Sequence, residues 1–133
     1  MDNMSQTKAS SDADKHPTIF VVDDEPMLLD LAAAILEPLG YEVRTFRDPQ
    51  TALAEFATAR PAVVVTDYAM GGMSGIDLIH ECRRVNPGQK TMLVSGTVDE
   101  HIYADDAARP DTFLAKPYQV GEFVKSVQHL AES

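Results

Sequence analysis

Four short apolar runs of the chain each end in side chains that could take part in metal or phosphoryl chemistry. The first run ends in Asp23-Asp24, and the others end in Asp67, Ser95 and Lys116. Short apolar runs that alternate with helical patterns predict a parallel sheet covered on both faces. Because open sheets of this kind build their sites at the carboxyl ends of the strands, the five side chains should meet in one crevice. Three carboxylates, a hydroxyl and an ammonium suit a divalent cation and a phosphoryl group.

The three carboxylates predict a cation site, because like charges in one crevice repel one another and a cation relieves that repulsion. Carboxylate oxygens are hard ligands of the kind that Mg²⁺ prefers. Asp23 and Asp24 are adjacent, so their side chains should point in different directions. One could bind the cation directly and the other through a water. An acidic pair in a loop is usually only solvated, but here other strand ends supply matching partners.

Asp67 is the candidate for the group that reacts, because a carboxylate can attack phosphorus and form an acyl phosphate. That step needs a cation, a positive side chain and a hydrogen-bond donor, which Mg²⁺, Lys116 and Ser95 would supply. Each residue also has a simpler interpretation: a turn or cap for Asp67, a Ser-Gly turn for Ser95, and a surface position for Lys116. Local sequence does not favour a cis bond at Lys116-Pro117, since only about 5–6% of such bonds in folded proteins are cis.

Size and composition predict one folded domain. The chain has 133 residues, of which 44% are hydrophobic, and no apolar stretch approaches the roughly 20 residues that span a bilayer. A net charge of −10 without a basic stripe disfavours direct binding to nucleic acid and favours a basic partner. The N-terminus lacks an apolar signal core, and the single Cys82 cannot form an internal disulfide. We therefore expect a cytoplasmic protein that does not bind a membrane.

Residues 1–16 are polar and should form a disordered tail, whereas a strand–helix pattern repeats five times over residues 17–133. A short strand is expected over 41–46, and a weaker, acidic helix over 99–108. Asp48 should cap the second helix. The side chains expected to face the core from the first and last helices are Leu28, Leu31, Ala32, Ile35, Leu36 and Leu39, and Val120, Phe123, Val124, Val127 and Leu130.

In order and spacing, the motifs resemble the receiver domain of two-component response regulators over nearly all of residues 17–133. The matching residues are Val22-Asp23-Asp24-Glu25, Asp67-Tyr68-Ala69-Met70, Met73-Ser74-Gly75, Val94-Ser95-Gly96 and Lys116-Pro117. No single motif is specific, but the five together in this order are. One departure is Met70-Gly71-Gly72, where the family often has Met-Pro. Two glycines lose more entropy on ordering than a proline would, so this loop should be looser.

The resemblance implies a flavodoxin-like α/β fold, a (βα)5 three-layer sandwich with a five-stranded parallel sheet in the order 2-1-3-4-5. It also implies that Asp67 is the phosphoacceptor and that Ser95 and Lys116 bind phosphoryl oxygens. The implied Mg²⁺ ligands are Asp23, Asp24, Asp67 and the backbone carbonyl of Ala69. Phe113 takes the place of the family's switch aromatic, although it could equally be an ordinary core residue of the fifth strand.

The function implied by the resemblance is a signalling switch that depends on phosphorylation. Asp67 would accept a phosphoryl group from a sensor histidine kinase or phosphotransfer protein. The surface of the fourth helix, fifth strand and fifth helix would then change and regulate a downstream protein. Such a chain catalyses only its own phosphotransfer and dephosphorylation and is not a turnover enzyme.

Three alternatives remain. The chain could be the receiver portion of a hybrid kinase or multidomain regulator, although Met1 and an end just after the last helix favour a stand-alone protein. It could be an interaction module that is never phosphorylated, although such modules usually lack an acid or the lysine. It could be a hydrolase of the haloacid dehalogenase type, but that family places an Asp-x-Asp motif after its first strand. Here that strand ends in Asp23-Asp24-Glu25.

Overall fold

The computed structural model describes residues 16–96 and 109–133 and contains one parallel sheet. The strands are β1 (Thr18–Val22), β2 (Glu42–Phe46), β3 (Val63–Asp67), β4 (Lys90–Ser95) and β5 (Thr112–Ala115). Their order in the sheet is β2-β1-β3-β4-β5, and every neighbouring pair is parallel. The predicted fold class and strand order are therefore confirmed. The expected tail, apart from His16, and the expected helix over 99–108 lie outside the described residues.

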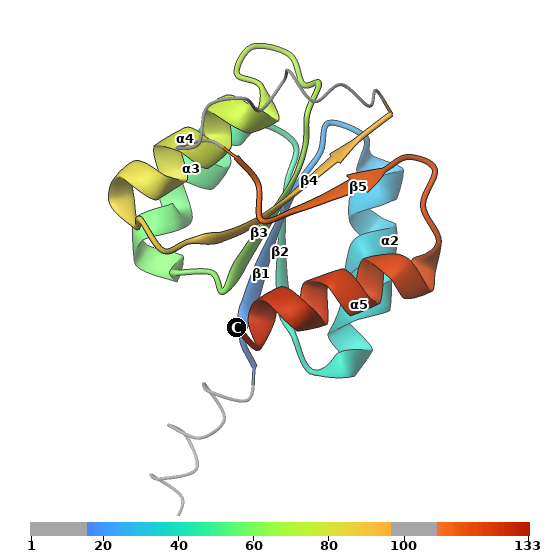
Figure 1. Ribbon diagram of the computed structural model, residues 1–133. Helices are drawn as coiled ribbons and strands as arrows, with labels where there is room; N and C mark the ends of the chain where they lie inside the picture. Colours follow the sequence, from blue (N-terminus) through green and yellow to red (C-terminus); the bar gives the residue numbers. More distant parts are fainter. Residues whose placement is uncertain (1–15, 97–108) are drawn as a thin grey trace, which may run out of the picture.

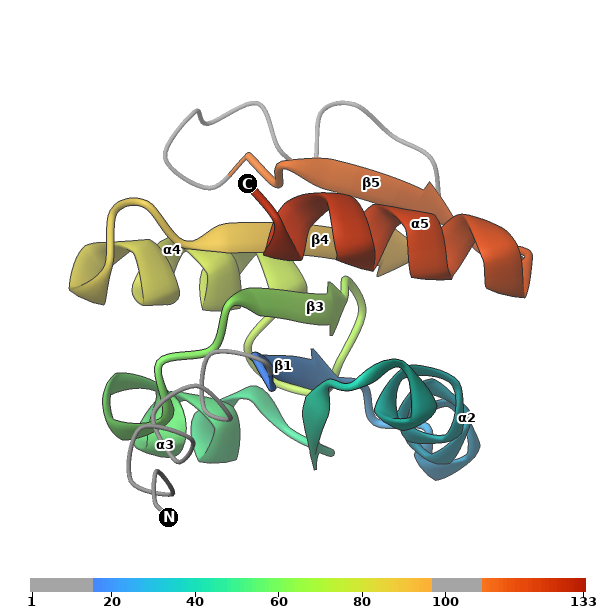
Figure 2. The same cartoon turned by 90° about the horizontal axis from the view of Figure 1, so that it is seen from below.

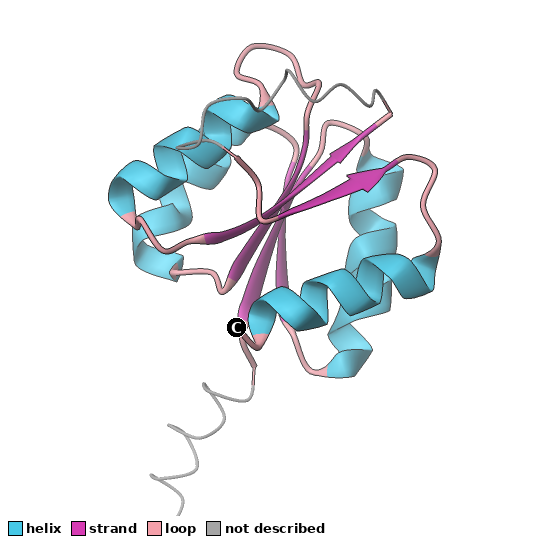
Figure 3. Ribbon diagram, in the orientation of Figure 1, coloured by secondary structure: helices cyan, strands magenta, loops and turns pink. Residues whose placement is uncertain are grey.

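Helices cover both faces of the sheet. They are α2 (Pro26–Leu36), followed by the short 3₁₀ helix η1 (Glu37–Leu39), α3 (Pro49–Ala59), α4 (Gly75–Val85) and α5 (Val120–Ala131). Helices α2 and α5 lie on one face and α3 and α4 on the other (Figures 1 and 2), so the molecule has three layers. In Figure 3 the magenta strands form the middle layer between the cyan helices. Among the described helices, none combines the length and apolar character that crossing a membrane requires.

The strands explain this layering, because successive side chains of a strand point to opposite faces of a sheet. In β1, Ile19 and Val21 belong to the apolar cluster beneath α2 and α5, whereas Phe20 and Val22 belong to the cluster beneath α3 and α4. All five residues of β3 are buried. Central strands with both faces covered can therefore be continuous apolar runs, as the sequence has them.

Local signals in the sequence set the helix ends. The Asp48 carboxylate accepts a hydrogen bond of 2.9 Å from the Thr51 amide, which confirms the predicted cap of α3. Ser74 and Asp77 form a reciprocal capping box at the start of α4. After η1 the chain turns at Gly40, whose φ of 99° is a left-handed conformation that glycine adopts without strain.

The predicted core face of α2 is wrong in part. Leu31 is 44% exposed and Leu39 is 48% exposed, whereas Leu29, which the prediction left out, is only 4% exposed. The helix buries a narrow face formed by Leu29, Ala32 and Leu36, and the turn at η1 carries Leu39 away from the sheet. In α5, Val120 is 49% exposed because the buried face begins one turn later, at Phe123.

The amino end of β5 is fastened to β4 and α4 by a network that the sequence patterns did not predict. The guanidinium of Arg83 donates to the Asp111 carboxylate at 3.0 Å and to the Thr91 hydroxyl at 3.1 Å. The same Asp111 oxygen accepts a 2.8 Å hydrogen bond from the Thr91 amide. Because β5 is short, this network fixes the strand that carries Lys116 just beyond its other end.

Candidate functional site

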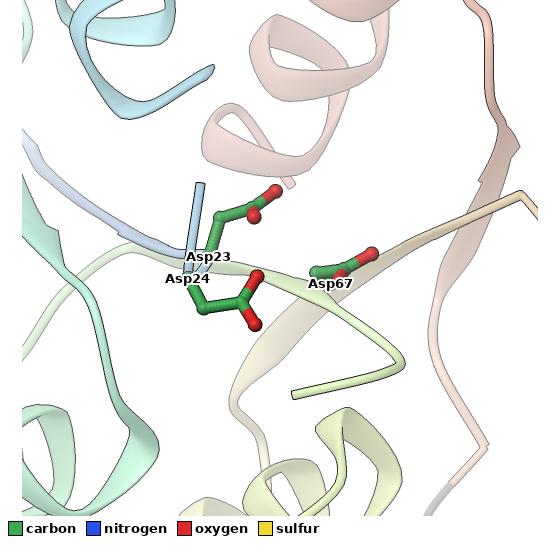
Figure 4. Close-up of side chains that lie close together, drawn as sticks. All are labelled: Asp23, Asp24 and Asp67. Atoms are coloured by element: carbon green, nitrogen blue, oxygen red, sulfur yellow. The ribbon is translucent and has the colours of Figure 1, made fainter. Parts of the chain in front are cut away.

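The carboxyl ends of β1 and β3 bring three carboxylates together. Asp23 and Asp24 follow β1, and Asp67 is the last residue of β3. One oxygen from each carboxylate can be chosen so that all three lie within 4.8 Å of one another. Figure 4 shows the three side chains close together at the ends of these strands, and we refer to the space between them as the crevice. Asp23 and Asp67 are 7% and 8% exposed, whereas Asp24 lies on the solvent side. Oxygen atoms this close could hold a small metal ion.

Lys116 completes the charge pattern of the crevice. Its Nζ lies 3.1 Å from Asp67 Oδ1 and 3.5 Å from Asp23 Oδ2. The other oxygen of Asp23 accepts a 2.9 Å hydrogen bond from the Glu25 amide. Asp23 is therefore held on both sides, and the ammonium of Lys116 sits between the two buried carboxylates. The bond between Lys116 and Pro117 is cis.

Backbone hydrogen bonds continue just beyond the ends of neighbouring strands and hold the site residues at the same edge of the sheet. The Asp23 amide donates to the Phe46 carbonyl at 3.0 Å, and the Lys116 amide donates to the Ser95 carbonyl at 2.8 Å. Between them, the Tyr68 amide donates to the Val94 carbonyl at 3.0 Å. Since these hydrogen bonds extend the ladder beyond the strand ends, strand pairing brings the backbones of Asp23, Asp67 and Lys116 to one edge of the sheet.

The charged groups of the crevice carry an excess of negative charge. Burial raises the pKa of Asp67 above its usual range; Lys116 opposes the rise, and the charges of Asp23 and Asp24 add to it. Burial alone would lower the pKa of Lys116, but the hydrogen bond with Asp67 and the charges of Asp23 and Asp67 outweigh it, so this pKa is raised. The Lys116 ammonium thus pairs with two of the three carboxylates, and a divalent cation would stabilise the ionised form of all three.

The remaining predicted residues lie around this centre. Ser95 is buried at the end of β4, and Ala69 is exposed two residues after Asp67. Phe113 is half-buried in β5, where it pairs with Leu93, while Ser95 pairs with Ala115. Paired residues of parallel strands face the same side of a sheet, so Ser95 and Phe113 share the face that lies away from α5.

A groove beside the crevice was not predicted. It has a volume of about 440 Å³ and is lined by Leu28, Leu31, Lys116, Pro117 and Tyr118. The Tyr118 ring stacks on Phe123, with 5.4 Å between ring centroids, and burial raises the pKa of the Tyr118 hydroxyl. Leu31 lines this groove instead of the core. Helical spacing alone cannot distinguish these two positions, so it predicts a core position for Leu31.

A family comparison decides what kind of domain carries this crevice. The family model described as the response regulator receiver domain matches residues 19–128. The chain belongs to this family. It is 36% identical over 121 residues to the probable transcriptional regulatory protein TcrX of Mycobacterium tuberculosis, covering 89% of this chain and 51% of that protein. It is 33% identical over 119 residues to the nitrogen assimilation regulatory protein NtrX of Azorhizobium caulinodans, covering 86% of this chain and 26% of that protein.

Solved receiver structures have the same fold. The response regulator TrrA of Thermotoga maritima, solved with Mg²⁺ and BeF, matches with a TM-score of 0.75 and 29% identity, covering 86% of this chain and 98% of that one. A receiver domain protein of Methanospirillum hungatei matches with a TM-score of 0.82 and 24% identity, covering 88% of this chain and 94% of that one. The chain thus spans nearly the whole length of these receivers but about half or less of the two curated relatives.

Proposed function

We propose that this receiver domain is a phosphorylation-dependent switch in which Asp67 accepts a phosphoryl group from a phosphohistidine of a kinase or phosphotransfer protein. One Asp67 oxygen attacks phosphorus, the bond between phosphorus and the donor imidazole breaks, and the imidazole nitrogen leaves with the electron pair. The observation that carries the proposal is the buried Asp67 carboxylate, 3.1 Å from the Lys116 ammonium inside a cluster of three acids. Lys116 can neutralise a phosphoryl oxygen, and the Ser95 hydroxyl can donate to another.

We further propose that Asp23, Asp24, Asp67 and the backbone carbonyl of Ala69 hold Mg²⁺. An all-oxygen donor set with carboxylates 4.8 Å apart or closer suits this ion. The relative from Thermotoga maritima was solved with Mg²⁺ and BeF, which supports the same assignment here. When bound, the ion would neutralise part of the negative charge that the phosphoryl group brings. Without it, an anionic donor would meet three carboxylates that, within the described part of the chain, have the Lys116 ammonium as their cationic partner.

The groove next to Lys116 fits the protein that brings the phosphoryl group. Because Lys116 contacts Asp67 and also lines the groove, we infer that a protein donor whose imidazole reaches Asp67 also covers the groove. The groove offers Leu28, Leu31 and Pro117, so the donor should present apolar side chains beside its histidine. This arrangement suits phosphotransfer between proteins better than repeated hydrolysis of a small phosphoester.

The same site would work in a longer protein. The curated relatives are transcriptional and nitrogen assimilation regulators of which the chain spans 51% and 26%, so a receiver that controls a fused output domain is the second candidate. A module that never becomes phosphorylated is disfavoured because the three acids lie together and Lys116 pairs with two of them. A cytoplasmic location is consistent with the buried, unpaired Cys82.

Intact-mass measurement after incubation with phosphoramidate and Mg²⁺ tests the proposal. We expect one phosphoryl group per chain, labile to hydroxylamine as an acyl phosphate is. A protein that remains unmodified under these conditions would contradict the switch. Sustained release of phosphate from a small phosphoester over many turnovers would instead support the hydrolase alternative.

We propose that Ser95 and Phe113 carry the signal from Asp67 to the surface of the fourth helix, fifth strand and fifth helix. Ser95 and Phe113 lie on the same face of neighbouring strands, offset by two residues. The Lys116 amide donates a hydrogen bond to the Ser95 carbonyl. If the Ser95 hydroxyl moves toward a phosphoryl oxygen on Asp67, the space next to Phe113 changes and the ring can turn inward. The partner bound there should present basic side chains, since the expected fourth helix contains Asp99, Glu100, Asp105 and Asp106.

Amide chemical shifts measured with Mg²⁺ and beryllofluoride, a mimic of the phosphoryl group, test this route. We expect the shifts to spread beyond the crevice to residues 96–108 and 111–118. Such a spread requires both states to be accessible, because a ligand only shifts an existing equilibrium. Shifts confined to residues 23–25 and 67–72 would remove Ser95 and Phe113 from the switch even if Asp67 is phosphorylated.

A further inference from the structure

Gly75, the first residue of α4, lies directly against the backbone of the phosphoacceptor. A Cβ atom placed on Gly75 would overlap the carbonyl oxygen of Asp67 and would lie 3.0 Å from the Asp67 carbonyl carbon. On its other side it would lie 3.0 Å from Cδ1 of Leu93, a fully buried side chain. The Gly75 amide also donates to the Tyr68 carbonyl at 2.9 Å. The start of the helix and the end of β3 are therefore in contact through their main chains.

The Asp67 carbonyl is also held by a side chain of its own strand. The hydroxyl of Thr66, which is completely buried, donates to the Asp67 carbonyl oxygen at 2.9 Å. Thr66 and Gly75 thus contact the same oxygen, one by a hydrogen bond and the other by close packing. The carbonyl and the carboxylate belong to one residue, so a shift of the carbonyl also moves the carboxylate relative to Asp23 and Lys116.

We propose that Gly75 and Thr66 are positioning residues that set the direction of the Asp67 carboxylate by fixing its carbonyl. The inference rests on the proposed function, since it concerns how the phosphoacceptor is aimed. The neighbouring structure leaves no easy way to absorb a larger residue at 75. The capping box of Ser74 and Asp77 holds the start of α4, and Leu93 blocks the path toward β4.

Other glycines of the same loop lack this property. A Cβ atom on Gly71 would meet nothing within 4 Å, and Gly71 does not have a positive φ. Gly71→Ala therefore changes the same residue type, four positions away, without touching the Asp67 backbone. A second control, Leu78→Ala, removes a buried side chain from the same helix and weakens its packing without adding an atom near the Asp67 carbonyl.

The test compares these variants by two measurements: Mg²⁺ affinity by calorimetry and the rate of phosphoryl uptake from phosphoramidate at saturating Mg²⁺. Both are made well below the melting temperature of each variant. Gly75→Ala should lose about 100-fold in rate, as expected for a misplacement of order 1 Å, and should bind Mg²⁺ more weakly. Thr66→Val, which keeps the shape but removes the donor, should lose about fivefold in rate. Gly71→Ala and Leu78→Ala should retain the rate and affinity of wild type.

The outcomes separate the inference from the proposed function. If wild type accepts the phosphoryl group and Gly75→Ala and Thr66→Val match it in rate and Mg²⁺ affinity, the positioning role is overturned. An equal loss in Leu78→Ala overturns it as well, because general destabilisation of α4 would then explain the result. If Gly75→Ala does not fold, Thr66→Val decides the question alone. If wild type accepts no phosphoryl group, the proposed function is overturned, and the ranking of Mg²⁺ affinities still decides whether Gly75 and Thr66 position Asp67.

Discussion

Asp67→Asn should lose phosphoryl uptake from phosphoramidate, with a rate at least about 1,000-fold below that of wild type. An amide cannot form the acyl phosphate, although it has nearly the same shape as the carboxylate and can remain beside Lys116. The loss should therefore occur in a folded protein with an unchanged sheet. Intact mass after incubation with Mg²⁺ and phosphoramidate measures the uptake.

A matched control for this variant is Asp30→Asn. Asp30 is an exposed acid on α2, so the substitution makes the same change in charge and atom type at a position away from the three carboxylates. We expect Asp30→Asn to be phosphorylated at the rate of wild type. If Asp67→Asn also keeps that rate, Asp67 is not the phosphoacceptor and another nucleophile must be sought.

The second large effect concerns Mg²⁺ and the melting temperature. At a concentration 100 times the dissociation constant, an ion that binds only the folded state adds about 2.7 kcal/mol to the free energy of unfolding, which is roughly 10 °C for a chain of this size. Asp24→Ala should lose most of this rise. In chelator the same variant should melt above wild type, because one of three repelling carboxylates has been removed.

Differential scanning calorimetry with and without a chelator measures both effects, and Asp30→Ala serves as the control for the loss of one exposed acid. The control should keep the full response to Mg²⁺. An Asp24→Ala variant with the same Mg²⁺ response as wild type would show that Asp24 is not a ligand. A wild-type melting temperature that does not change when Mg²⁺ is added would contradict the proposed metal site.

Much of this crevice could be predicted from sequence because its side chains stand at strand ends. Once the apolar runs ending at Asp23, Asp67 and Lys116 are taken as neighbouring parallel strands, pairing alone brings their ends to one edge of the sheet. The strand order itself came from the resemblance to receiver domains, since hydrophobic periodicity says nothing about which strands are neighbours.

The features that could not be predicted depend on contacts between distant segments. Helical spacing placed Leu31 in the core with Leu36, but the width of the buried face depends on how α2 sits on the sheet. The ion pair of Arg83 with Asp111, at 3.0 Å, joins two segments that lie far apart in the sequence, so no local pattern indicates it. Gly75 belongs to one of the motifs that resemble receiver domains, but only the approach of the Asp67 carbonyl shows why a larger side chain does not fit.

The central claim is that Asp67 carries the phosphoryl group when a divalent cation is bound, and chemical trapping tests it most directly. Borohydride reduces an acyl phosphate to an alcohol and so converts a phosphorylated aspartate to homoserine, which tandem mass spectrometry of the peptides can locate. After incubation with phosphoramidate and Mg²⁺, we expect this conversion at Asp67 and at no other aspartate, and none in excess chelator. Conversion at Asp23, Asp24 or another acid, or equal conversion of Asp67 in chelator, would contradict the account.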